Sequence, residues 1–339
     1  MKLLVFEFAT ATGLEDPAIS AEGLAMLEAV LEDLKEFKPH YLVSNRNKIV
    51  KSKAIPISVD ENIYDWLNKY LKDYDACLPI APEEDYLLYD LTKIIEKNGV
   101  KVLGTDSGTV KLTTNKFETY NALNGKVPVI KTERIFFEDD LEEYGRSIFH
   151  EDIFKVVKPA DGVSCSCVMI VNSLDEFLNA VNSIKQFTKF PYFIMQEYVP
   201  GESVSVSLIS NGETAVPLSL NLQNIKISSG EFIYSGGKVP LNHEMSNIAK
   251  QTAKKAIELF EGIVGFVGVD LIINESGVHL VEINSRLTTP YVALRQIINF
   301  NLGTAVINAV NGEIPENIEL NGEVNFYKEG KALRVSVLK

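Results

Sequence analysis

The chain has 339 residues, of which 46% are hydrophobic and 23% charged, and its 33 basic and 46 acidic residues give a formal net charge of −13. The length corresponds to about two domains, and the composition is that of a globular protein, which excludes a disordered chain, a collagen and a bundle of membrane helices. The acidic excess argues against a nucleic-acid partner, because surfaces that bind nucleic acid are rich in Lys and Arg.

The N-terminal residues and the cysteines indicate the compartment. Glu7 interrupts the first apolar run, where a signal peptide needs uninterrupted apolar residues. No run of about 18 apolar residues is present, so no membrane-spanning helix is expected. The three cysteines are too few for a disulfide scaffold. We therefore expect a cytoplasmic protein with no membrane partner, and the sequence leaves open whether it is a monomer or a homodimer.

Apolar strand-like runs alternate with segments of helical periodicity, which predicts a fold of the α/β (or α+β) class. In the first part we expect strands at 2–8, 41–43, 76–80 and 100–103, and helices at 20–34, 60–72 and 87–97. This alternation predicts a compact N-terminal domain at residues 1–105.

Two further domains are expected after residue 105. The middle domain, 106–198, is predicted to contain helices at 114–123 and 174–187 and strands at 128–135, 154–158, 168–171 and 192–198. The last domain, 199–339, is predicted to contain strands at 203–210, 215–222, 265–274 and 278–283, a helix at 243–261, and helices after Pro290 and Gly303. Residues 323–326 and 332–338 resemble short strands.

The most informative segment is residues 265–286, where Asp270, Glu282 and Asn284 interrupt apolar strands. A three-residue turn at 275–277, closed by a glycine with positive φ, predicts a β-hairpin in which residue 274 pairs with 278. Asp270 then lies opposite Glu282, and Asn284 shares their face because side chains alternate along a strand. Two opposed carboxylates repel each other, so this arrangement favours a hard divalent cation, Mg²⁺ or Mn²⁺, between them.

Two lysines are candidates for binding phosphate. Lys158 ends an apolar strand and is followed by the small residues of the loop 160–166, whose N–H groups could surround phosphate oxygens. Lys116 lies in the first turn of the helix at 114–123, where the helix dipole favours an anion. Taken singly, each lysine is also compatible with an ordinary solvated side chain.

Residues 193–203 form the fourth informative element. A strand runs into a Pro-Gly turn, and Glu202 opens the next strand. Backbone groups at such a turn can pair with the edge of an adenine, and a carboxylate there can accept hydrogen bonds from ribose hydroxyls. The sequence contains no P-loop, no G-x-S-x-G and no H-E-x-x-H motif, which removes the most familiar alternatives.

In this order the four elements resemble the ATP-grasp superfamily of ligases, over residues 116–286, with a Rossmann-like pre-ATP-grasp domain ahead of them. The resemblance implies an ATP-grasp fold, ATP as cofactor and two bound metal ions. It implies ATP contacts from Lys116, Lys158, Gly162, Ser164, Cys165, Ser166, Glu197, Tyr198, Val199 and Glu202, metal ligands Asp270, Glu282 and Asn284, and catalytic roles for Lys158 and Arg286. Some members carry an arginine two residues before the metal aspartate; here Gly268 occupies that position, which places more of this role on Arg286.

A narrower resemblance joins residues 6–13 and 282–291 to the archaeal tyramine–L-glutamate ligases of methanofuran biosynthesis. It implies that small molecules are the substrates. The γ-carboxylate of L-glutamate would be activated as an acyl-phosphate and joined to the amine of tyramine, releasing ADP and phosphate. The predicted substrate contacts, each also compatible with a capping or packing role, are Glu7, Thr10, Thr12, Thr288, Thr289, Tyr291 and Arg295.

Three alternatives remain open from the sequence. The first is an ATP-grasp ligase for another amino acid or a D-alanyl substrate. The second is a non-catalytic ATP-binding module, and the third is a carboxylase that acts through carboxyphosphate. The lack of an obvious nucleophilic Ser, Cys or His motif fits all ligase versions, because phosphoryl transfer needs positioning and charge neutralisation more than a covalent protein nucleophile.

Overall fold

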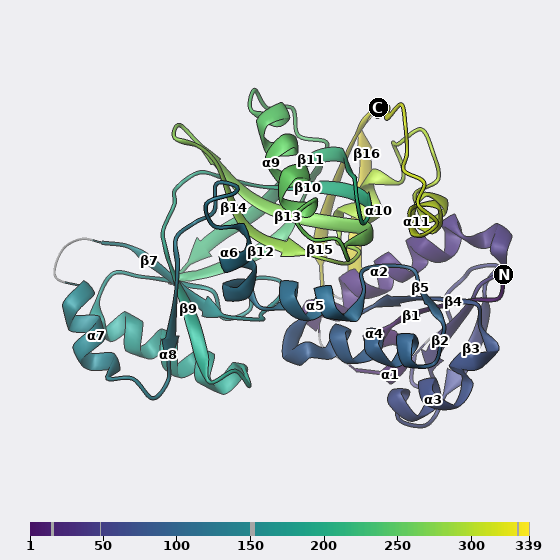
Figure 1. Cartoon of the computed structure of the whole chain (residues 1–339), viewed down its shortest axis with the longest axis horizontal. Coiled ribbons are helices and arrows are strands. Elements are labelled where there is room, and N and C mark those ends of the chain that lie inside the picture. Colours follow the sequence, from purple (N-terminus) through teal and green to yellow (C-terminus); the bar gives the residue numbers. More distant parts are fainter. Residues whose placement is uncertain (15–16, 48, 150–152, 331, 339) are drawn as a thin grey trace.

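The computed structural model describes residues 1–14, 17–47, 49–149, 153–330 and 332–338. Figure 1 shows an N-terminal sheet with its helices at one end. At the other end lie α7 (Leu141–Ile148) and α8 (Leu174–Phe187) with β7 (Lys155–Pro159) and β9 (Tyr192–Glu197), and between the two ends lie the strands around β10 (Glu202–Asn211) and β13 (Val264–Asn274). Among the described residues, none of the helices combines the length and apolar character that crossing a membrane requires.

The N-terminal sheet is parallel, with strand order β3-β2-β1-β4-β5. Its strands are β1 Leu3–Glu7, β2 His40–Ser44, β3 Ile55–Val59, β4 Ala76–Ile80 and β5 Lys101–Val102. The helices of this part are α1 Phe8–Thr12, α2 Pro17–Asp33, α3 Ile63–Tyr70 and α4 Leu87–Lys97, with short 3₁₀ helices at Lys35–Phe37, Leu71–Asp73 and Glu84–Tyr86. Every residue of β1 and β4 is buried, as expected for central strands of a parallel sheet that is covered on both faces.

Two N-terminal predictions need correction. The first long helix begins at Pro17 and not after a cap at Ser20, consistent with the preference of proline for a first helical position. The sequence analysis also missed β3, because this strand is mostly exposed and contains Pro56. Both features are typical of an edge strand, whose apolar pattern is weak.

The second sheet follows the order β14-β13-β10-β11-β12-β8-β7-β9-β6, and β15 adds to β12. One half, which we call the small sheet, consists of β6 Thr132–Phe136, β7 Lys155–Pro159, β8 Met169–Val171 and β9 Tyr192–Glu197, with α7 Leu141–Ile148 and α8 Leu174–Phe187. The other half, the large sheet, consists of β10 Glu202–Asn211, β11 Ala215–Ser228, β12 Glu231–Val239, β13 Val264–Asn274 and β14 Gly277–Asn284, with α9 Ser246–Ile257. The sequence analysis missed α7 and β12 and ended β11 at residue 222.

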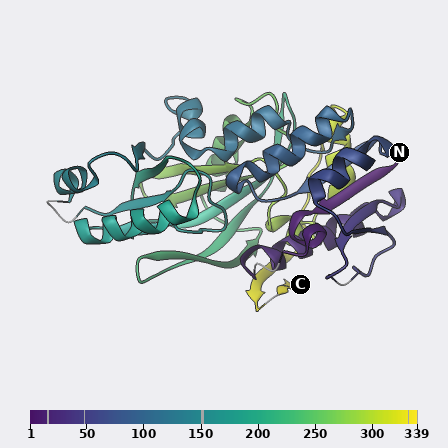
Figure 2. The ribbon, with the colours of Figure 1, turned by 90° about the horizontal axis from the view of Figure 1, so that it is seen from below.

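The remaining helices and strands link these parts. They are α5 Ser107–Thr114, α6 Lys116–Leu123, α10 Pro290–Leu294, α11 Leu302–Val310, β15 Glu323–Glu329 and β16 Ala332–Leu338. The predicted helix at 114–123 corresponds to α6, which is capped by Asn115 and separated there from α5. β15 and β16 pair with each other, and β16 contacts α2. Figure 2 shows these yellow strands beside the purple N-terminal helices.

The apolar cores do not follow the predicted boundary at residue 105. One core contains Leu3 and Leu31 from the N-terminal part together with Phe266 and Val306 from the C-terminal part. A separate core, which includes Phe177 of α8, lies between the small sheet and its two helices. The N-terminal sheet and the C-terminal elements therefore pack as one body, to which the small sheet is joined through β8 and β12.

Candidate active site

The hairpin of β13 and β14 places Asp270 directly opposite Glu282, which confirms the predicted pairing. The predicted turn, however, is wrong. Asn274 pairs with Gly277, so the loop contains two residues rather than three. Between this turn and the carboxylates the pairing shifts by one residue. Because of this shift, Asp270 pairs with Glu282 as predicted, although the turn is one residue shorter than predicted.

The shift is a β-bulge at Val281, which changes the face on which the following residues lie. Leu280 and Ile283 are both buried in the core beneath the large sheet, whereas Val281 and Glu282 both line a cavity on the opposite face. A strand with strict alternation would have placed Glu282 on the same face as Leu280. The bulge is therefore what brings Glu282 to the side of Asp270.

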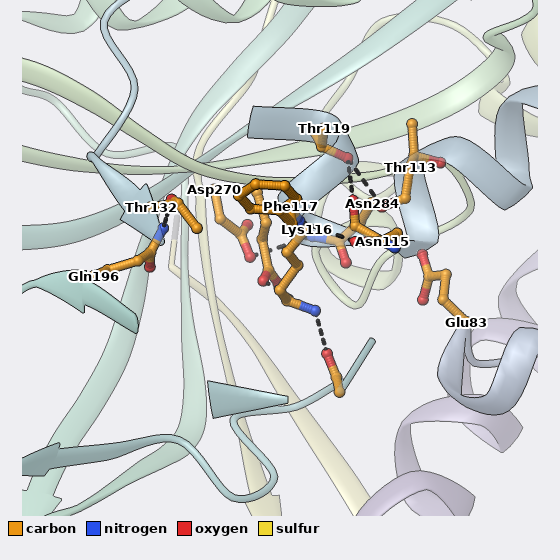
Figure 3. A network of polar contacts seen from close by, with 12 residues as sticks. Glu83, Thr113, Asn115, Lys116, Phe117, Thr119, Thr132, Gln196, Asp270 and Asn284 are labelled. Atoms are coloured by element: carbon orange, nitrogen blue, oxygen red, sulfur yellow. Dashed lines mark hydrogen bonds and ion pairs between the residues drawn. The ribbon is translucent and has the colours of Figure 1, made fainter. Parts of the chain in front are cut away.

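Asp270 is held by two side-chain amides. Gln223 Nε2 donates to one carboxylate oxygen at 3.1 Å, and Asn284 Nδ2 donates to the other at 3.2 Å. Burial and the adjacent charge of Glu282 raise the pKa of Asp270 to about 7. Figure 3 shows Asp270 and Asn284 in one view with Lys116, which approaches from α6.

The charge of Glu282 is offset by the two predicted phosphate-binding lysines. Lys116 Nζ is 3.5 Å from Glu282 Oε2 and donates to the carbonyl of Gly162 at 2.6 Å. Lys158 is only 4% exposed, and burial lowers its pKa to about 8. Burial opposes ionisation of Glu282, but Lys116 and Lys158 outweigh it and hold the pKa of Glu282 below its ordinary value.

The donor set fits a divalent cation whose remaining ligands come from water and substrate. No group of three His, Cys, Asp or Glu side chains suited to a metal occurs in the described part of the chain. Asp270, Glu282 and Asn284 nevertheless offer two carboxylates and an amide oxygen, and Mg²⁺ is usually bound by one or two carboxylates plus phosphate oxygens. A cation would also relieve the repulsion between two opposed, largely buried carboxylates.

A first cavity extends from these lysines and carboxylates between the small and large sheets. Glu197, Tyr198 and Val199, for which the sequence predicts ATP contacts, are among its lining residues. Glu202 does not line it in the structure; its carboxylate lies 3.9 Å from His243 Nε2. The apolar walls, which suit a flat aromatic base, are formed by Ile130, Val156, Val168, Ile225, Ile227, Phe232, Leu271 and Ile272.

The predicted phosphate loop is divided between cavities. Gly162 lines the first cavity, Ser164 lines a second, and Cys165 borders both. Ser166 lines neither of these two cavities, and its backbone N–H donates to the carbonyl of Val163 at 2.9 Å. The structure thus brings three of the four predicted loop residues to the site.

The second cavity adjoins the first, and Asp270 and Glu282 border both. Arg286 lines it, with its Nε donating to Glu83 Oε2 at 2.6 Å and its Nη1 to the carbonyl of Leu287 at 3.0 Å. Burial opposes the charge of Arg286, but Glu83 raises its pKa above the ordinary value. The other lining residues include Glu7, Glu22, Gly23, Met26, Ile80, Ala81, Pro82, Tyr234, Thr288 and Thr289.

The packing around Gly268 explains the missing arginine. A Cβ atom at this position would lie 2.7 Å from Cγ2 of Thr288, which is too close for any side chain without movement. Thr288 itself lines the second cavity. Arg286 is accordingly the arginine that reaches this cavity from the hairpin.

The predicted substrate contacts separate into two groups. Glu7, Thr288 and Thr289 line the second cavity. The others do not: Thr10 donates to Glu7 Oε2 at 2.7 Å, and Thr12 donates to the carbonyl of Phe8 at 2.8 Å. These two threonines support the first helix rather than face a ligand.

Tyr291 and Arg295 are also not brought to the site. Tyr291 is fully buried and donates to Asp33 Oδ2 at 2.6 Å. Arg295 donates to Asp33 Oδ1 from Nε at 2.9 Å and from Nη2 at 2.6 Å. These contacts attach α10 to α2, so both residues serve the packing of the C-terminal part on the N-terminal part.

Arg295→Ala is therefore expected to lower stability without changing substrate affinity. The substitution removes the cation from the buried carboxylate of Asp33, and we expect the free energy of unfolding to fall by about 2 kcal/mol. Denaturant unfolding measures this change, and Arg146→Ala, which removes an exposed ion pair with Glu142, should cost less than about 0.5 kcal/mol. If Arg295→Ala raised the KM for a substrate and left the free energy of unfolding unchanged, Arg295 would be a substrate contact after all.

The sequence analysis missed several residues that line the site. Gln223 lies one residue beyond the predicted end of its strand, although the alternation of polar and apolar residues continues through it. Glu83 does not line a cavity itself, but it follows the buried strand β4 and holds Arg286, which does; ligands commonly bind beyond the carboxyl ends of parallel strands. The sequence contains no comparable signal for Glu22 and Tyr234. Glu22 lies within the helix α2, and Tyr234 lies on β12, a strand that was not predicted.

Comparison with known proteins agrees with this architecture. A pre-ATP-grasp domain model matches residues 38–110, and an ATP-grasp domain model matches residues 113–290. The tyramine–L-glutamate ligase of Methanocaldococcus jannaschii is 34% identical, covering 92% of this chain and 90% of that protein. The tyramine–L-glutamate ligase of Methanocaldococcus fervens is 33% identical over 98% of this chain and 99% of that protein. A putative ATP-grasp superfamily protein from Archaeoglobus fulgidus superimposes over the whole of both chains with a TM-score of 0.76 and 27% identity.

The chain therefore belongs to the ATP-grasp family, and the resemblance inferred from its motifs is confirmed. Within that family it is a relative of the tyramine–L-glutamate ligases, as the narrower resemblance predicted. The α/β class with a pre-ATP-grasp domain is confirmed as well. Family and relatives together define an ATP-dependent ligase that forms carbon–nitrogen bonds.

Proposed function

We propose that this chain joins the γ-carboxylate of L-glutamate to the amine of tyramine at the expense of ATP. The observation that supports the substrates is the identity of 34% and 33% to two tyramine–L-glutamate ligases over nearly the whole chain. The geometry supports the reaction class, because Asp270 and Glu282 stand where two cavities meet. One cavity would hold ATP and the other the acid and the amine.

The first cavity offers the contacts that a nucleotide needs. The apolar walls and the strand end at 197–199 would hold the adenine, and Lys116 and Lys158 would contact the phosphates. Asp270, Glu282 and Asn284 would hold Mg²⁺ or Mn²⁺, which when bound offsets phosphate charge and orients the transferred phosphoryl group. We propose that these residues would hold a pair of ions.

The reaction proceeds in two displacements. A carboxylate oxygen of glutamate attacks the γ-phosphorus of ATP, the bond to the bridging oxygen breaks, and ADP leaves. The neutral amine nitrogen then attacks the acyl carbon, phosphate leaves, and the nitrogen loses a proton to give the amide. Lys158 on one side and Arg286 on the other would offset the negative charge that accompanies both steps.

ADP release is expected only when L-glutamate and tyramine are both present with ATP and Mg²⁺. A coupled assay for ADP measures this requirement, and mass spectrometry of the product should give the sum of the two substrates less one water. The matched controls are glutarate in place of glutamate and tyrosol, 4-(2-hydroxyethyl)phenol, in place of tyramine. Tyrosol has a hydroxyl where tyramine has its amine, so it should yield no amide.

Turnover with a different acid and amine, but none with this pair, would contradict the proposed substrates and retain the ligase. Tight ATP binding without turnover over a broad panel of acids and amines would favour a nucleotide-binding module. ADP release that requires bicarbonate would favour a carboxylase.

A further inference from the structure

The second cavity contains a buried carboxylate without a protein cation. Glu7 ends β1, is 3% exposed and lines this cavity. No Lys, Arg or His nitrogen of the described residues lies within the 4.0 Å of an ion pair with it. Glu7 differs in this respect from Glu22 and Glu282, which line the same cavity.

Two of the other carboxylates have a counter-charge in the protein. Glu282 lies 3.5 Å from Lys116, and Glu22 contacts Lys328. Asp270 has none, but it is the partner of Glu282 in the proposed cation site, where a bound cation would supply one. Arg286, the arginine that lines the cavity, is engaged by Glu83. Neither Lys328 nor Arg286 therefore neutralises Glu7.

The carboxylate of Glu7 is fixed by neutral donors. Oε1 accepts from the backbone N–H of Ala9 at 2.9 Å, and Oε2 accepts from the N–H and hydroxyl of Thr10, both at 2.7 Å. Gly23 of α2 packs against its other side, where a Cβ would lie 2.6 Å from both Cδ and Oε1. These contacts orient the carboxylate and leave Oε1 with capacity for another donor.

Neutral donors only partly offset the cost of burying this charge. Burial raises the pKa of Glu7, while the bonds from Thr10 and Ala9 act in the opposite direction. A buried ionised carboxylate is stabilised most strongly by a cation that donates hydrogen bonds to it. In an open substrate cavity, the ligand can supply that cation.

We propose that Glu7 is the counter-ion that recognises a primary ammonium group of a substrate in the second cavity. The inference rests on the proposed function, in which both the amino acid and the amine carry such a group. The α-ammonium of L-glutamate and the ammonium of tyramine share this chemistry. A ligand with the same shape but no ammonium should bind less tightly.

Calorimetry with the full chain and Mg²⁺-ADP tests this recognition without turnover. Two ligand pairs are compared, L-glutamate with glutarate and tyramine with tyrosol, in the wild type and in Glu7→Gln. Asp106→Asn is the matched control, because Asp106 also caps a helix and accepts from the N–H and hydroxyl of a threonine three residues later, at 2.9 and 3.0 Å, but lines neither cavity. Gly23→Ala, which displaces the carboxylate without removing it, provides a second variant should Glu7→Gln unfold.

We expect the wild type to bind one ammonium ligand about 10- to 100-fold more tightly than its ammonium-free partner. Glu7→Gln and Gly23→Ala should lose this preference, and Asp106→Asn should keep it. The ligand pair for which the two variants lose the preference shows whether Glu7 binds the ammonium of L-glutamate or that of tyramine. Equal preferences in the wild type and Glu7→Gln, or no preference in either pair, would overturn the assignment. A chain that shows the preference but forms no amide would contradict the proposed function and leave the role of Glu7 standing.

Discussion

Asp270→Asn combined with Glu282→Gln is expected to abolish metal-dependent ATP turnover in a chain that remains folded. The two substitutions remove both carboxylates of the proposed cation site, and amide oxygens bind Mg²⁺ and Mn²⁺ far more weakly than carboxylates. Folding should survive because the two carboxylates oppose each other and are only partly exposed, so the neutral side chains of the variant lack the repulsion present in the native site. ADP release measured against metal concentration, together with thermal unfolding, checks both parts.

The control for this variant lies in the same hairpin. Glu275 is exposed in the turn between β13 and β14, so Glu275→Gln changes a charge of the hairpin away from the site. We expect it to retain wild-type turnover and metal dependence. If the double variant kept Mg²⁺-dependent turnover, the assignment of Asp270 and Glu282 as metal ligands would be wrong.

Lys158→Ala and Arg286→Ala are each expected to slow turnover by about 10²–10³, or ~3–4 kcal/mol, as for other groups that stabilise charge in a transition state. Lys158 lines the first cavity from the small sheet, and Arg286 lines the second cavity from just beyond the end of β14. Because the effect concerns the transition state, kcat should fall more than the KM for ATP rises. Steady-state kinetics with saturating acid and amine measure the two constants separately.

Each substitution has its own control. Lys155→Ala removes a lysine from the same strand as Lys158 but outside both cavities, and turnover should be unchanged. Arg286→Lys keeps a charge without the planar fork that bonds Glu83, so it should recover only part of the rate. A near-wild-type kcat in either alanine variant would exclude that residue from the proposed role.

The hairpin shows how far sequence patterns reach. Polar residues interrupting apolar strands, with Gly277 as a turn signal, were enough to place Asp270 opposite Glu282. The prediction assumed a longer turn and strict alternation, and the structure has a shorter turn and a bulge. The bulge is visible in the spacing of the buried apolar residues Val278, Leu280 and Ile283, which breaks the period of two.

The predicted substrate residues show what local sequence patterns cannot predict, namely which polar side chains line a cavity. Thr288, Thr289, Tyr291 and Arg295 follow one another closely, yet two line the cavity and two are bonded into the core. What separates them is the carboxylate of Asp33, more than 250 residues earlier in the chain, which engages Tyr291 and Arg295. Local sequence contains no information about that partner.

The sequence by itself determined the fold class, the family and the pairing of the carboxylates, since these follow from the hydrophobic period, the order of the motifs and contacts within one hairpin. Only the tertiary structure decided which polar side chains face the cavities and which ones they oppose. Lys116, Lys158 and Glu282 come from three separate elements, and Gly23 of α2 packs against the carboxylate of Glu7 at the end of β1. Charge and burial at such positions depend on contacts between residues distant in the chain, and those contacts form only on folding.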